Sequence, residues 1–91
     1  MKEADFSKWL KKEREYSHKS TSDALSRCRR IERIFGVSLD KKLSSESGFE
    51  GLRDRVSNES ELLVGNGKRK LYTARGVHRL ALKLYFEFLK A

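Results

Sequence analysis

The 91-residue sequence contains no proline, so the residue that most often interrupts an α-helix is missing throughout. Leucine, lysine, arginine, glutamate, alanine and serine are common, whereas the β-branched residues valine and isoleucine are scarce. This composition favours helices over strands. Because so short a chain can build only one small core, we predict a single all-α domain over residues 1–91.

Four segments carry apolar residues at the three- and four-residue spacings of amphipathic helices. They predict helices at about 4–15, 20–35, 47–58 and 72–89, packed as a small bundle of four principal helices. Ser20, Thr21 or Ser22 is expected to cap the second helix, and Gly36 to end it. The predicted core consists of Phe6, Trp9, Leu10, Ala24, Cys28, Ile31, Phe35, Phe49, Leu52, Leu80, Leu84 and Phe88.

The connections between these helices contain further apolar residues. Leu39 and Leu43 are expected to turn inward from a polar connection. The apolar triplet 62–64 is too short to classify, although it could add one turn packed on the core.

The last predicted helix is apolar on more than one side. One stripe, expected to face the core, consists of Val77, Leu80, Ala81, Leu84, Tyr85 and Phe88. Leu82, Phe86 and Leu89 fall on another side. Either this helix lies at the centre of the bundle, or its second side docks a neighbouring domain or a partner protein.

Basic residues outnumber acidic ones, and they concentrate towards the two ends of the chain. The net charge is +8 and the isoelectric point about 9.9. Residues 1–36 hold ten basic and six acidic side chains, residues 37–65 four and six, and residues 66–91 seven and one. A polyanion would therefore be attracted to the two ends of the sequence and not to its middle.

The sequence lacks the residue sets that several classes of protein function require. A single cysteine, Cys28, allows no internal disulfide, and together with His18 and His78 it makes no zinc-binding or catalytic set. Cys28 is expected to act as a small buried apolar residue, and each histidine as a surface residue. The loop 65–70 lacks the spacing of a phosphate-binding loop. We expect no enzyme activity and no cofactor.

No apolar run approaches the roughly 18 residues that cross a bilayer, and the N-terminus lacks the apolar stretch of a signal peptide. We therefore expect a soluble, cytoplasmic protein without a membrane partner.

Two segments resemble the core-binding domain of tyrosine recombinases, the phage-integrase family, whose N-terminal domain is SAM-like. The opening Phe6-Ser7-Lys8-Trp9-Leu10 is followed by Ser17-His18-Lys19-Ser20-Thr21 and a basic helix ending Ile31-Glu32-Arg33-Ile34-Phe35. The segment from Val77 to Leu89 is similar to the last helix of that domain, which precedes a separate catalytic domain. The resemblance implies a four-helix module that embraces one side of a DNA duplex.

Double-stranded DNA is therefore the expected partner, bound through basic helix faces. The candidate contacts are Lys19, Ser20, Thr21, Arg29, Arg30, Arg33, Lys68, Arg69, Lys70, Tyr72, Arg75 and Arg79. Helical spacing predicts that Arg30 and Arg75 face solvent, so that reversing both charges should abolish DNA binding without unfolding the domain. The alternative function is protein interaction, or accessory DNA binding for another enzyme, with docking through Leu82, Phe86 and Leu89.

Overall fold

All regular structure is helical in the computed structural model, which describes residues 1–64 and 71–91. The helices are α1 (Glu3–Glu13), α2 (His18–Phe35), α3 (Leu39–Lys42), α4 (Glu46–Asn58), the 3-10 turn η1 (Ser60–Leu63) and α5 (Leu71–Lys90). These described residues contain no strand, and α1, α2, α4 and α5 are the four principal helices. The predicted all-α bundle is therefore confirmed.

The turn between α1 and α2 comes earlier than predicted. The α1 helix ends at Glu13, and Glu15 adopts the left-handed conformation with φ 54°. The Ser17 side chain then accepts a hydrogen bond from the Ser20 amide at 3.1 Å. Ser17, and not a residue at 20–22, is thus the cap, because its extended backbone aims the hydroxyl at the first free amides. Gly36 closes α2 with φ 62°, as predicted.

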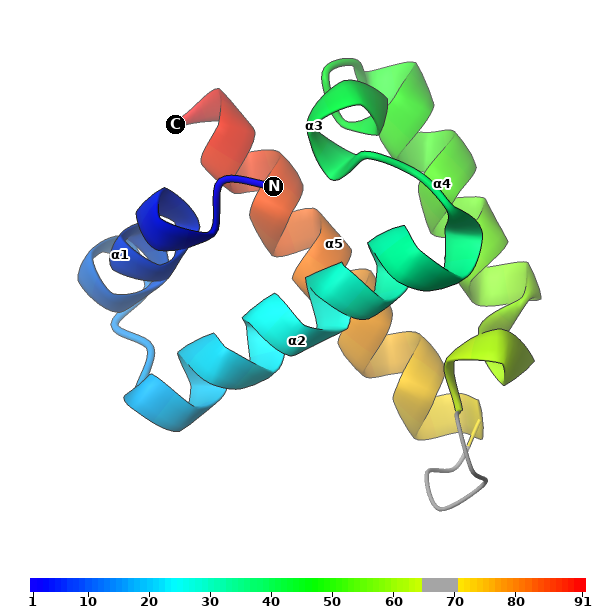
Figure 1. The fold of residues 1–91 in the computed structure, drawn as a ribbon, viewed down its shortest axis with the longest axis horizontal. Coiled ribbons are helices and arrows are strands. Elements are labelled where there is room, and N and C mark those ends of the chain that lie inside the picture. The colour runs from blue at the N-terminus through cyan, green and yellow to red at the C-terminus, as the bar shows by residue number, and fades with distance from the viewer. Residues whose placement is uncertain (65–70) are drawn as a thin grey trace.

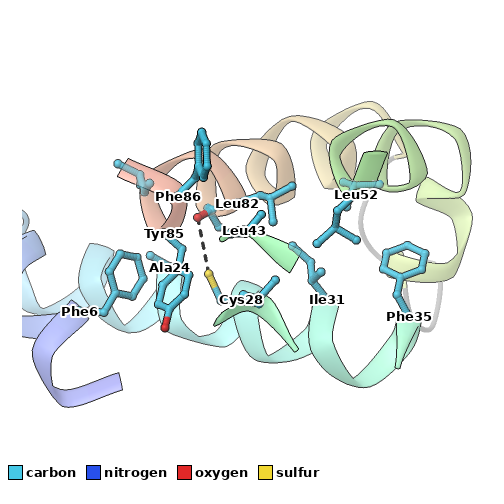
Figure 2. Close-up of a cluster of buried hydrophobic side chains, with 14 of the residues drawn as sticks. Phe6, Ala24, Cys28, Ile31, Phe35, Leu43, Leu52, Leu82, Tyr85 and Phe86 are labelled. Atoms are coloured by element: carbon cyan, nitrogen blue, oxygen red, sulfur yellow. Dashed lines mark hydrogen bonds between the residues drawn. The ribbon is translucent and has the colours of Figure 1, made fainter. Parts of the chain in front are cut away.

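The α5 helix lies at the centre of the bundle. In Figure 1, α2 crosses in front of α5, α4 lies along another side, and α1 packs near the C-terminal end. At the crossing, the Cys28 thiol donates to the Ala81 carbonyl oxygen at 3.6 Å, shown dashed in Figure 2. Burial raises the pKa of this thiol to about 12, with Glu32 adding to the effect. Cys28 is therefore an inert core residue, as the sequence indicated.

The buried side of α5 differs from the prediction. Leu82 is fully buried and Phe86 is buried, whereas the predicted core residue Leu80 remains 49% exposed. The assignment was wrong because α5 is covered from two directions, by α2 and by α4, so the centre of its buried side is shifted around the helix. Leu82 therefore cannot contact an external partner, and Phe86 exposes only 7% of its surface.

Several other predicted core residues lie at the edge of the core. Trp9, Phe49 and Phe88 pack against it while partly exposed, and so does Leu89, which was predicted on the second side of the last helix. Conversely His78, expected at the surface, is fully buried. The remaining predicted core residues are buried, as expected: Phe6, Leu10, Ala24, Cys28, Ile31, Phe35, Leu52 and Leu84.

The short elements α3 and η1 complete the core. Leu39, Leu43 and Leu63 are buried, so the connections fold inward as the sequence suggested for Leu39 and Leu43. Gly48 allows α4 to begin against α3, since a Cβ atom there would lie 1.9 Å from the Lys42 carbonyl oxygen.

The Tyr85 hydroxyl joins three elements near the N-terminus. It donates to Asp40 at 2.6 Å and accepts from the Lys2 amide at 2.8 Å. Burial and the bond to Asp40 raise the pKa of Tyr85. Burial alone would raise the pKa of Asp40, but the bonds from Tyr85 and from the Met1 amino group outweigh it and lower that pKa. This polar link holds α3 and the start of α1 against α5.

Candidate nucleic-acid interface

The outer side of α2 carries a shallow groove lined by arginine. Its volume is about 420 Å³, and its lining residues are Ser26, Arg29, Arg30 and Arg33. We call these four residues the α2 arginine face. They lie on the opposite side of α2 from the buried stripe, because residues three, four and seven apart share one side of a helix. No carboxylate lines this groove.

Two of the arginines on this face are exposed. Arg29 is held by Glu3 of α1, with 2.8 Å between Arg29 Nε and Glu3 Oε1. The hydrogen bond from Arg29 lowers the pKa of Glu3, and the same bond raises that of Arg29. Arg33 is exposed as well. Both side chains are therefore accessible to a phosphate without any rearrangement of the core.

Arg30 is not a freely solvated charge. It is partly buried, and its Nη1 lies 3.1 Å from Nε2 of the buried His78. A guanidinium can only donate, so Nε2 accepts; Nδ1, 2.6 Å from the Ala74 carbonyl oxygen, must then carry the imidazole hydrogen. The predicted solvent-facing position is wrong, because α2 packs close enough to α5 for Arg30 to reach its side chains.

Arg75 is also partly buried, with its Nε donating to the Ser60 hydroxyl at 3.3 Å. Reversing the charges of Arg30 and Arg75 together would break two contacts between elements. The prediction that this double change spares the fold therefore rests on an incorrect premise.

Thr21 is not available for a DNA contact. It is 2% exposed, and its hydroxyl donates to the Ser17 carbonyl oxygen at 2.8 Å. Position 21 falls on the buried side of α2 because it lies three and seven residues before Ala24 and Cys28. This candidate was wrong.

Lys19 and Ser20 are exposed at the start of α2. Lys19 forms an ion pair with Asp23 at 3.5 Å, and Ser20 bonds to the capping Ser17. The candidates Lys68, Arg69 and Lys70 lie outside the described residues, as does the side chain of Tyr72.

Arg79 is exposed and lines a different and larger groove, between α4 and α5. We call this the α4/α5 groove; its volume is about 600 Å³. The basic residues that line it are Arg53, Arg79, Lys83 and Lys90. The sequence candidates included only Arg79, although the spacing of residues 79, 83 and 90 already places three cations on one side of a helix.

The two basic surfaces share no lining residue. The α2 helix packs across α5 (Figure 1), and Arg30 of the α2 arginine face reaches α5 through His78. Among the described candidates, Arg29, Arg30 and Arg33 line the first groove, whereas Arg79 lines the second.

Comparison of the chain with protein families, with curated proteins and with solved structures finds no match in any of the three. Within the described residues, no group of three His, Cys, Asp or Glu side chains could hold a metal ion. No described helix is long and apolar enough to cross a membrane.

Proposed function

We propose that this chain binds double-stranded DNA through the α2 arginine face. The observation that carries the proposal is a groove on the outer side of α2 lined by three arginines and one serine, where Arg29 is paired with Glu3 of α1. Guanidinium groups pair with phosphate oxygens in a fork geometry, and a neighbouring hydroxyl adds another donor.

The dimensions of this face suit a phosphate backbone. Residues 26 to 33 extend about 10 Å along the helix axis, a length over which one DNA strand carries about three phosphates. The contacts of Arg29 with Glu3 and of Arg30 with His78 reduce the freedom of both side chains before DNA arrives. Less conformational entropy is then lost on binding.

Such contacts give affinity and position but little sequence selectivity. Within this proposal, the chain acts as a DNA-binding module without chemistry of its own, beside a separate catalytic domain, as the resemblance to tyrosine recombinases implies. The proposal depends on the α2 arginine face and not on that resemblance, for which the comparisons provide no match.

Fluorescence anisotropy with a labelled duplex of about 20 base pairs tests the proposal. At about 50 mM salt, Arg33→Glu should weaken binding about tenfold, and it should flatten the dependence of log Kd on log salt by about one phosphate contact. Arg33 is the right position because it is exposed and forms no ion pair among the described residues.

The matched control is Lys12→Glu on α1, which changes the net charge equally at another exposed residue. It should weaken binding by less than about threefold. Equal losses for the two variants would reduce the interaction to net charge and contradict an interface on α2. Absence of duplex binding by the unaltered chain at low salt would also contradict the proposal.

A further inference from the structure

The α4/α5 groove combines an apolar floor with a cationic rim, unlike the purely polar α2 arginine face. On its floor, the Phe49 and Phe86 rings stack with 4.3 Å between centroids and 3° between planes. Leu80 leaves 49% of its surface exposed beside them. A Cβ atom at Gly76 would meet no heavy atom within 4 Å, so the α5 backbone is accessible there.

The rim is positively charged and little neutralised. Of the five charged residues that line the groove, four are basic and only Glu87 is acidic. Glu87 forms an ion pair with Arg14, the residue that follows α1, which satisfies its charge from outside the groove. Arg53 has Asp54 as its ion-pair partner, at a distance of 3.9 Å. The rim therefore favours an occupant that brings carboxylates.

The arrangement of the aromatic rings argues against nucleic acid as that occupant. One face of each ring is covered by the other ring. The Arg53 guanidinium lies 5.6 Å from the Phe49 centroid, and the Lys90 ammonium lies 4.1 Å from the Phe86 centroid. A single-stranded base needs an open aromatic face for stacking, and a duplex backbone presents no apolar group to a hydrophobic floor.

An acidic amphipathic peptide matches both parts of the groove. A bulky apolar side chain would bury the exposed parts of Leu80 and Phe49, which contributes about 25 cal/mol for each Å² removed from water. Flanking carboxylates would meet Arg79 and Lys83, for which the described residues provide no ion pair. Apolar anchors at the centre with charges at the rim are typical of peptide-binding grooves.

We infer that the α4/α5 groove, lined by Leu80 and Lys83 among others, docks an acidic segment of another protein that carries a bulky apolar anchor residue. This inference is independent of DNA binding by α2, since the two grooves share no residue. The chain would then connect a DNA duplex on one face with an acidic protein partner on the other.

Selection from a displayed library of random peptides of about 12 residues tests the inference on the full chain. Enriched peptides should contain Asp or Glu around Leu, Phe or Trp. A synthetic peptide from this set should bind at least about tenfold more weakly to Leu80→Glu and to Lys83→Glu. The matched control is Leu62→Glu, because Leu62 is 48% exposed and lies outside the groove; it should change binding less than about twofold.

Circular dichroism checks that each variant remains helical, and because Leu80 and Lys83 are both exposed, either one can report if the other fails to fold. Enrichment of basic or neutral peptides, no enrichment at all, or peptides that bind Leu80→Glu as well as the unaltered chain would overturn the inference. If Lys83→Glu weakens binding of the chain to the DNA duplex as much as Arg33→Glu does, the groove belongs to the DNA interface and the peptide proposal is wrong. Peptide binding without DNA binding would contradict only the proposed function.

Discussion

The α2 and α5 helices differ in how much of their circumference is covered by other elements. The α2 helix buries one stripe, including Ala24, Cys28 and Ile31, and exposes the opposite side. The α5 helix packs against α2, α4, α1 and η1, so buried residues extend around more of its surface. The exposed side of α2 can therefore be read from residue spacing, whereas that of α5 depends on which helices cover it.

The strongest test of this difference replaces two leucines of α5 by alanine, one in each variant. Leu82→Ala should lower the free energy of unfolding by about 2–5 kcal/mol, because it leaves a cavity where the side chain is fully buried. Leu80→Ala, at a residue that is 49% exposed, should change it by less than about 0.5 kcal/mol. Urea unfolding followed by circular dichroism measures both. Comparable losses, or the reverse order, would show that α5 is rotated relative to the arrangement in Figure 2.

The interface between the two helices can be tested through Cys28. Its pKa is raised from 9.0 to about 12 in the folded chain, so between these values the folded state keeps a proton that the unfolded state releases. Stability must then fall as pH rises through this window. Between pH 8.5 and 10.5 the contribution is about 2 kcal/mol.

The measurement is the free energy of unfolding at both pH values for the unaltered chain and for Cys28→Ala. The variant should be less stable at the lower pH, because a buried side chain is truncated, yet it should lose about 2 kcal/mol less on going to the higher pH. The raised pKa of Tyr85 acts in the same direction in both proteins and largely cancels in the comparison, because Cys28 is the smallest of its causes. Parallel pH profiles would indicate that the thiol is open to solvent.

The smallest expected changes in stability come from replacing the glycine that closes α2 and one glycine of α5 by alanine. Gly36 closes α2 at φ 62°, where a side chain is strained, so Gly36→Ala should destabilise the chain by about 1 kcal/mol. Gly76 lies within α5 with open space around it, so Gly76→Ala should stabilise by up to about 1 kcal/mol. Thermal unfolding should therefore shift in opposite directions, and a shift of the same sign would mean that one glycine has been misplaced.

Short-range sequence patterns predicted the buried side and the end of α2 correctly. The spacing of residues 20–35 located the buried side of α2, and Gly36 marked its end. The cap was missed by one turn, because several hydroxyl residues could serve and only the backbone at Ser17 selects among them. Thr21 lies on the buried side because it is in register with Ala24 and Cys28.

The candidate site was predicted only in part. Arg29 and Arg33 are exposed on α2 as expected, because one covered stripe leaves the opposite side free. The α4/α5 groove was missed because Arg53 and Phe49 of α4 line it together with Lys83 and Phe86 of α5, which lie 30 or more positions away in the sequence. No local spacing connects these two segments.

The sequence by itself determined the all-helical class, the excess of positive charge and the buried side of α2, because these follow from composition and from the periodicity of a helix covered on one side. The tertiary structure decided the environments of Leu80, Leu82, His78 and Arg30, and with them the two separate basic surfaces. The physical reason is that α5 is apolar around much of its circumference. For such a helix, burial is set by the neighbours that pack against it and not by its own pattern.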